Sequence, residues 1–207
     1  MAGLDDSIQA LLFDFGGVLA EEGFRNGLVA MATEQGLDVT AMPGEGMRAV
    51  YDSGFVLGRG SVAEFWTLLR QRTGLTGDDD ALTETILSGF IIRPSMIMLV
   101  RQLRAANYVT GILSDQTYWL DSLDEIYHFY TVFDRVYNSY YLGKGKQDPA
   151  LFSEVASDLG MTPSEILLVD DDPGNVQRAR SAGWHAICYV DQQSLVAEMA
   201  SLGIRSM

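Results

Sequence analysis

Five short apolar segments, separated by stretches with helical patterns, limit the folds that this chain can adopt. Each segment is short and ends at polar or glycine residues, which is typical of strands buried on both faces of a sheet. Strands that alternate with helices predict right-handed crossovers and a parallel sheet. We therefore expect an α/β fold with a Rossmann-like, doubly wound parallel sheet, whose strands are Ile8–Phe13, Val109–Leu113, Val132–Tyr137, Ile166–Val169 and His185–Val190.

The helices expected between these strands have recognisable ends. Proline at the first helical position and glycine or asparagine just past the last turn are typical boundaries. They predict helices from Pro94 to about Asn107, from Asp148 to Gly160 and from Pro173 to Gly183. Thr162–Glu165 has the pattern of a capping box and predicts one short helical turn before the fourth strand.

The segment from Glu21 to Ile91 breaks this alternation, because it has no convincing strand pattern. It predicts a small all-helical cap formed by residues 21–91, inserted into a core formed by residues 1–20 and 92–207. Asp78–Asp80 favours a solvated helix start over a metal site. The helix-like segments are Asn26–Glu34, Met47–Tyr51, Ser61–Arg72 and Ala81–Leu87.

Composition excludes several classes of function. The formal net charge of −14 disfavours nucleic acid and anionic membrane surfaces as partners. Cys188 is the only cysteine, which excludes a disulfide framework and a thiolate zinc site. Met1–Gln9 lacks the pattern of a signal peptide, and no segment is apolar enough to span a bilayer. We expect a cytoplasmic protein that is a monomer or a homodimer.

Polar residues stand where three of the expected strands end. Asp14, Ser114 and the pair Asp170-Asp171 follow apolar segments, and Lys146 lies in a loop between the last two. An acid after a strand is more often a helix cap than a nucleophile. Because ligands bind at the carboxyl ends of parallel strands, these residues together indicate phosphoryl transfer.

The same residues fall in four motifs that span nearly the whole chain. They resemble those of the haloacid dehalogenase superfamily, in the phosphatase-like branch whose helical cap follows the first motif. The motifs are Phe13-Asp14-Phe15-Gly16-Gly17-Val18-Leu19, Ile112-Leu113-Ser114-Asp115, Lys146 with Asp148-Pro149, and Leu168 to Val176 followed by Ala182-Gly183.

This resemblance implies that Asp14 is a nucleophile that forms an aspartyl-phosphate. The Ser114 hydroxyl, the Asp115 backbone N–H and the Lys146 ammonium would bind the phosphate. Lys144 competes with Lys146, and Gln147 stands where the family commonly has proline. The implied substrate is a small phosphorylated metabolite, similar to a sugar phosphate.

The resemblance also implies a Mg²⁺ cofactor. Its ligands would be Asp14, the backbone carbonyl of Gly16, Asp170 and Asp171, because Mg²⁺ prefers oxygen ligands. Asn175 would support the loop or a metal-bound water, and it is almost as well explained as an ordinary helix residue.

Gly16 departs from the family pattern. The family's phosphatases usually carry a second aspartate two residues after the nucleophile, which protonates the leaving oxygen. Its absence favours a leaving group that needs little protonation, as in an acyl phosphate or a sugar 1-phosphate. Alternatively, a nearby acid such as Glu21 or Glu22, or another acid of the cap, replaces it, although Glu21 and Glu22 are better explained as solvated residues of the cap. A third alternative is a module that binds phosphorylated ligands and turns them over poorly.

A different chemistry is also open, that of a 2-haloacid dehalogenase, which requires no metal and also lacks the second aspartate. The adjacent acids Asp170-Asp171 favour phosphoryl transfer over it. Substrate contacts are expected in the cap, but spacing does not separate them from packing residues. The candidates are Phe24, Arg25, Tyr51, Phe55, Arg59 and Trp66.

Overall fold

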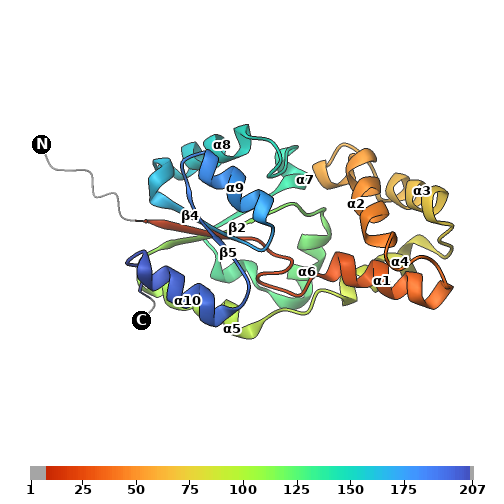
Figure 1. Ribbon diagram of the computed structural model, residues 1–207, viewed down its shortest axis with the longest axis horizontal. Helices are drawn as coiled ribbons and strands as arrows, with labels where there is room; N and C mark the ends of the chain where they lie inside the picture. The colour runs from red at the N-terminus through yellow and green to blue at the C-terminus, as the bar shows by residue number, and fades with distance from the viewer. Residues whose placement is uncertain (1–7, 206–207) are drawn as a thin grey trace, which may run out of the picture.

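The computed structural model of the protein describes residues 8–205, so most of the amino-terminal segment Met1–Gln9 lies outside the described residues. A five-stranded, fully parallel sheet forms its centre, with strand order β3-β2-β1-β4-β5 (Figure 1). The predicted α/β fold is confirmed. The strands are β1 Ala10–Phe13, β2 Val109–Ser114, β3 Arg135–Asn138, β4 Ile166–Asp170 and β5 His185–Cys188.

Helices cover both faces of the sheet. Successive strand residues point to opposite faces, and the residues on each face are apolar, so both faces need a covering layer. Leu11 and Phe13 join one apolar cluster, whereas Ala10 and Leu12 join another. On the first side lie α5 (Pro94–Ala105), α6 (Trp119–Tyr127) and α10 (Gln192–Ser201); on the other lie α8 (Ala150–Leu159) and α9 (Pro173–Ser181) (Figure 1).

The predicted helix boundaries of α5, α8 and α9 are confirmed. Pro94 and Pro173 lie in the first turn of their helices, and Gly160 ends α8 with a left-handed φ of 66°. Thr162 opens the expected short turn, η3 (Pro163–Glu165), and its N–H donates to the Glu165 carboxylate at 2.7 Å. The sequence patterns did not indicate α6, α10 or the short helix α7 (Ser139–Leu142).

The third strand was predicted too early in the chain. Val132, the first residue of the segment predicted as Val132–Tyr137, is the last residue of a short 3-10 helix, η2 (Tyr130–Val132), and the strand starts at Arg135. Val132 and Phe133 are nevertheless buried. An apolar run reports burial, and it does not separate a strand from a buried turn.

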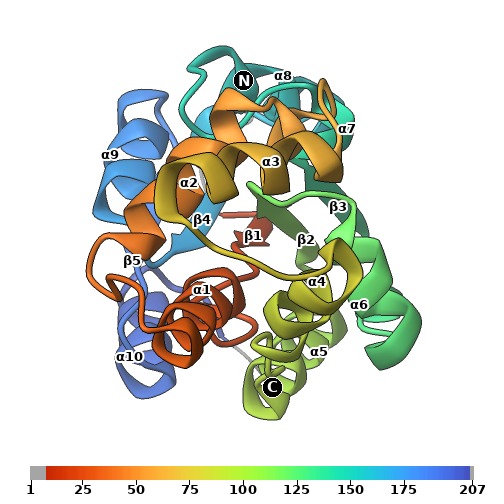
Figure 2. The ribbon, with the colours of Figure 1, turned by 90° about the vertical axis from the view of Figure 1, so that its right-hand side faces the viewer.

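The segment between β1 and α5 is helical, as expected. It contains α1 (Gly23–Gln35), α2 (Met42–Asp52), η1 (Phe55–Leu57), α3 (Val62–Thr73) and α4 (Asp79–Ser88). Asp78 caps α4 by accepting a hydrogen bond from the N–H of Asp80 at 3.0 Å, so the acidic run is a helix start. These helices lie together beyond the carboxyl ends of the strands (Figures 1 and 2).

The two chain segments that connect this helical group to the sheet run antiparallel to each other and pair at Ala20 and Ile92. The N–H of Glu21 donates to Ile91 at 2.9 Å, and the N–H of Arg93 donates to Leu19 at 2.9 Å. The Arg93 guanidinium also donates to the carbonyl of Gly17 at 2.5 Å. This pairing supports the proposed division into a core and a cap at residues 20–21 and 91–92.

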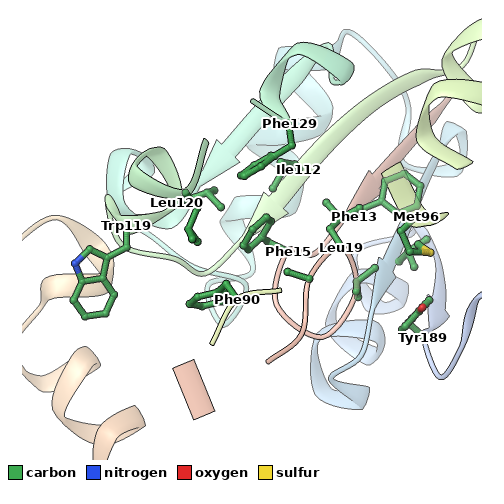
Figure 3. Packing of buried hydrophobic residues seen from close by; sticks show 14 of the residues in the cluster. Phe13, Phe15, Leu19, Phe90, Met96, Ile112, Trp119, Leu120, Phe129 and Tyr189 are labelled. Atoms are coloured by element: carbon green, nitrogen blue, oxygen red, sulfur yellow. The ribbon is translucent and has the colours of Figure 1, made fainter. Parts of the chain in front are cut away.

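Aromatic side chains continue the core from the sheet into the helical group. Phe15 stacks on Phe129 with ring centroids 4.9 Å apart and packs against Phe90 at 5.7 Å (Figure 3). Trp119 of α6 meets the edge of Phe55 at 5.3 Å. The helical group is therefore packed on the core through buried aromatic area. Within residues 8–205, we find no helix with the length and hydropathy needed to cross a bilayer.

Candidate active site

The parallel sheet brings the predicted strand-end residues into direct contact. Phe13 pairs with both Ile112 and Val169, so β1, β2 and β4 end side by side. The Ser114 hydroxyl donates to Oδ1 of Asp14 at 2.6 Å. Residues a hundred positions apart in the chain thus meet because their strands share a register.

Lys146 is the cation of this site. Its Nζ lies 2.7 Å from Oδ2 of Asp14 and 2.6 Å from Oδ2 of Asp170, and its side chain is 1% exposed. The competing candidate, Lys144, is instead paired with Glu154 at 2.5 Å. Of the two lysines, only Lys146 reaches the acids.

The loop that carries Lys146 is fixed by Asp115. Both carboxylate oxygens of Asp115 accept from the backbone N–H of Lys146, at 2.9 and 3.1 Å. A Cβ on Gly145 would lie 2.8 Å from this carboxylate, so glycine permits the close approach. The side chain of Asp115 therefore positions the loop. Only its backbone N–H is expected at the phosphate.

Burial and neighbouring charges shift the pKa values of Asp14 and Lys146. Burial raises the pKa of Asp14 to about 7, although Lys146 acts in the opposite direction. Burial alone would lower the pKa of Lys146, but Asp14 and Asp170 outweigh it and raise the pKa above its usual value. Lys146 is thus held as an ammonium.

Asp14, Asp170 and Asp171 form an acidic cluster, with one oxygen of each carboxylate within 4.8 Å of the others. Burial, followed by the charge of Asp170, raises the pKa of Asp171. Gly17 has a φ of 76°, and a Cβ there would lie 2.2 Å from Asp171. Three carboxylates against one ammonium leave an excess of negative charge, so this oxygen donor set fits a hard divalent cation such as Mg²⁺.

Asn175 orients Asp170. Its Nδ2 donates to both oxygens of Asp170, at 3.1 and 3.2 Å, and its own N–H donates to Asp172, which caps α9. The N–H of Asp172 also donates to Asp170 at 2.9 Å. Asp170 is fully buried, and these bonds hold its carboxylate in place.

A cavity of about 370 Å³ lies between the strand ends and the helical group. Of the six substrate contacts considered from sequence, three line it: Phe24, Arg25 and Tyr51. The other three do not. Phe55 and Trp66 are buried, and Arg59 donates to the carbonyl of Gly143 at 2.6 Å. Apart from Glu22, the remaining wall of the helical group is apolar and contains Pro43, Met47, Val50 and Val56.

A sequence profile of haloacid dehalogenase-like hydrolases matches residues 8–183. The chain belongs to this family. Flavin mononucleotide hydrolase 1 of Arabidopsis thaliana is 27% identical to it over 127 residues, which are 61% of this chain. The chain spans about half (52%) of the length of that curated relative.

Solved structures of haloacid dehalogenase-like proteins share the fold of this chain, and they hold different bound molecules. A family enzyme from Bacteroides thetaiotaomicron, in complex with magnesium and inorganic phosphate, matches with a TM-score of 0.68 and 21% identity, covering 91% of this chain and 99% of its own. L-2-haloacid dehalogenase from Xanthobacter autotrophicus, with covalently bound chloropropionic acid, matches with 0.66 and 19%, covering 96% and 84%. The fold alone therefore leaves the reaction open.

The two acids weighed as substitutes at Gly16 occupy different surroundings in this haloacid dehalogenase-like chain. Glu21 is 47% exposed, and its carboxylate is paired with Arg93 at 3.1 Å. Glu22 is partly buried and lines the cavity, so the solvated position expected for it is wrong. Burial, followed by the charge of Asp171, raises the pKa of Glu22.

Sequence reasoning missed several cavity residues of this family member. Arg178 lies one helical turn after Asn175, a spacing that could have indicated it, and its Nη2 donates to Oδ1 of Asn175 at 2.5 Å. Trp119 lines the cavity from α6, and its Nε1 has no hydrogen-bond partner among the described residues. Nothing in the sequence around Trp119 indicated that helix.

Proposed function

We propose that this chain is a Mg²⁺-dependent phosphohydrolase that acts on a small phosphorylated metabolite through an aspartyl-phosphate on Asp14. The observation that carries the proposal is the acidic cluster of Asp14, Asp170 and Asp171, placed beside Lys146 at one end of the cavity. A displacement at carbon by a lone carboxylate needs no such cluster. The cluster is the feature that favours phosphoryl transfer over the dehalogenase reaction.

Asp14 is held as a nucleophile from two sides. Ser114 donates to Oδ1, as does the N–H of Phe15 at 2.7 Å, while Lys146 contacts Oδ2. The carboxylate thus points toward the cavity with little freedom to rotate, which lowers the entropic cost of in-line attack on phosphorus. The attack forms a bond between phosphorus and an Asp14 oxygen and releases the alcohol.

The phosphate would be bound by fixed donors. The Ser114 hydroxyl and the Lys146 ammonium would turn from Asp14 to the phosphoryl oxygens, with the N–H of Asp115 as a third donor. Asp14, Asp170, Asp171 and the carbonyl of Gly16 would hold Mg²⁺, and the bound ion would neutralise charge on the phosphate and the carboxylates.

The cavity wall narrows the substrate class. Its apolar face suits a ring or other apolar body, and Arg25 is placed for a second anionic group. Flavin mononucleotide, the substrate in the name of the Arabidopsis relative, has a ring system and belongs in the first panel. Sugar 1-phosphates, sugar 6-phosphates, nucleotides and acyl phosphates complete that panel.

The deciding experiment measures phosphate release from p-nitrophenyl phosphate and from the panel, with and without Mg²⁺. We expect turnover only with Mg²⁺, and none by Asp14→Asn, which has the same shape without the nucleophile. If no ester were turned over in the presence of Mg²⁺, the result would favour a module that binds phosphorylated ligands without hydrolysing them. Metal-free release of halide from 2-chloropropionate would establish the dehalogenase instead.

A further inference from the structure

Hydrolysis of an unactivated phosphate ester needs a group that protonates the departing oxygen and later activates water. The candidates are the acids that face the cavity: Asp14, Glu22, Asp115, Asp171 and Asp172. In the proposed function, on which the following inference rests, Asp14 is the nucleophile and Asp171 belongs to the acidic cluster. Three acids then remain.

Two of the three are already engaged. Asp115 accepts from the hydroxyl of Tyr51 at 3.0 Å and from the backbone of Lys146. Asp172 caps α9 by accepting from the N–H of Asn175 at 2.8 Å. The Glu22 carboxyl, by contrast, makes no hydrogen bond and no ion pair with any other residue in the range 8–205.

The Glu22 carboxyl also lies beside Gly16, the position where the family's phosphatases usually carry the acid/base aspartate. Gly16, two residues after Asp14, does not have the left-handed φ that would demand glycine. A Cβ built on it would lie 2.8 Å from Oε1 of Glu22 and 3.6 Å from the Phe90 ring. Glu22 therefore fills the space that a side chain at position 16 would occupy, in the cavity that Asp14 also lines.

We propose that Glu22 is the acid/base residue of this enzyme. In the first step an Asp14 oxygen bonds to phosphorus, the bond from phosphorus to the ester oxygen breaks, and that oxygen takes the proton of the Glu22 carboxyl. In the second step the Glu22 carboxylate takes a proton from water, whose oxygen bonds to phosphorus. The bond to Asp14 breaks, its electron pair returns to Asp14, and inorganic phosphate leaves.

The test uses Glu22→Gln, which keeps the shape and removes the acid, on two esters with Mg²⁺. With p-nitrophenyl phosphate, whose leaving group needs no proton, we expect a burst of one equivalent of nitrophenol per protein and then slow turnover. A phosphorylated protein should then be detected by intact-mass measurement. With glycerol 2-phosphate we expect no burst, and kcat should fall by about 10²–10⁴-fold. Glu21→Gln, the neighbouring acid paired with Arg93, should retain wild-type kinetics on both esters.

A second pair of variants relocates the acid. Glu22→Ala opens the space beside position 16, and Gly16→Asp in that background should turn over glycerol 2-phosphate faster than Glu22→Ala alone. Wild-type kinetics in Glu22→Gln, an equal loss on both esters without a burst, or no gain from the added aspartate would overturn the role of Glu22. Failure of the wild type on every ester would overturn the proposed function, and this role with it.

Discussion

The two walls of the cavity are held in different ways. The strand-end wall includes Asp14, Ser114, Lys146 and Asp171, with the buried Asp170 behind them, and its central groups are joined by contacts of 2.6–2.7 Å. The helical wall consists of Phe24, Arg25, Pro43, Met47, Val50, Tyr51 and Val56. Met47 there is 50% exposed, Arg25 is exposed, and the bond from Tyr51 to Asp115 connects the two walls.

This difference separates two tasks. Groups that act on a phosphoryl centre need positions fixed to a fraction of an ångström, which buried and hydrogen-bonded side chains on strand ends provide. The rest of a substrate is selected by the shape of the wall that it contacts. Exposed side chains suit this task, because substitutions among them change that shape at little cost to stability. We therefore expect substitutions in the strand-end wall to affect both stability and kcat, and substitutions in the helical wall to affect mainly KM.

The largest effect is expected for Lys146→Met. Methionine fills a similar volume but leaves Asp170 buried without its cation, which typically costs about 3–5 kcal/mol of unfolding free energy. Turnover should fall by at least about 10²–10³-fold, because a donor to the developing charge is lost. Urea unfolding and steady-state kinetics measure the two effects.

Lys144→Met is the matched control for this substitution. Its pair with Glu154 lies at the surface, so its loss should cost no more than about 1 kcal/mol and leave kcat unchanged. A similar small cost for Lys146→Met would show that the strand-end wall is no more tightly held than its surroundings.

The strand-end wall could be predicted from sequence because one rule connects the residues to their positions. Apolar runs that end at Asp14, Ser114 and Asp170 predict strands, and parallel strands end at one edge of the sheet. Lys146 was predicted from its loop position and from its spacing to Asp148-Pro149, which resembles the family's third motif. The placement of Val132 failed because burial in a turn and burial in a strand leave the same apolar pattern.

The helical wall could not be predicted in this way. Aromatic residues at helical spacing pack inside the helical group or face the cavity, and the pattern is the same for both. Phe24 lines the cavity while Phe55 is buried. Adjacent acids show the same limit, because the bond that holds Glu21 away from the cavity is made by Arg93, 72 residues away in the chain.

An intermediate effect, dependent on metal, is expected for Asp171→Asn. Without metal this variant should be at least as stable as the wild type, because it removes a charge from three crowded carboxylates. With Mg²⁺ at about 100 times its Kd, the wild type should gain about 2.7 kcal/mol of unfolding free energy, and the variant less. Thermal unfolding across a Mg²⁺ titration measures both values.

The control is Asp172→Asn, the next acid along the chain, which lies outside the acidic cluster. Asparagine caps a helix as well as aspartate does, so α9 should keep its start and the Mg²⁺ response should equal that of the wild type. Equal loss of the Mg²⁺ response in both variants would indicate a diffuse acidic surface in place of a defined site.

The smallest effect is expected for Arg25→Ala in the helical wall. The guanidinium is exposed, so a contact with a second anionic group of the substrate should be worth about 0.5–1 kcal/mol, which corresponds to a several-fold rise in KM. Neither kcat nor the KM for p-nitrophenyl phosphate, which has no second anion, should change. Arg48→Ala is the control, because Arg48 pairs with Glu45 on α2 and does not line the cavity. A loss of kcat on p-nitrophenyl phosphate in Arg25→Ala would contradict the division of tasks, because an exposed residue of the helical wall would then act on the reacting phosphate itself.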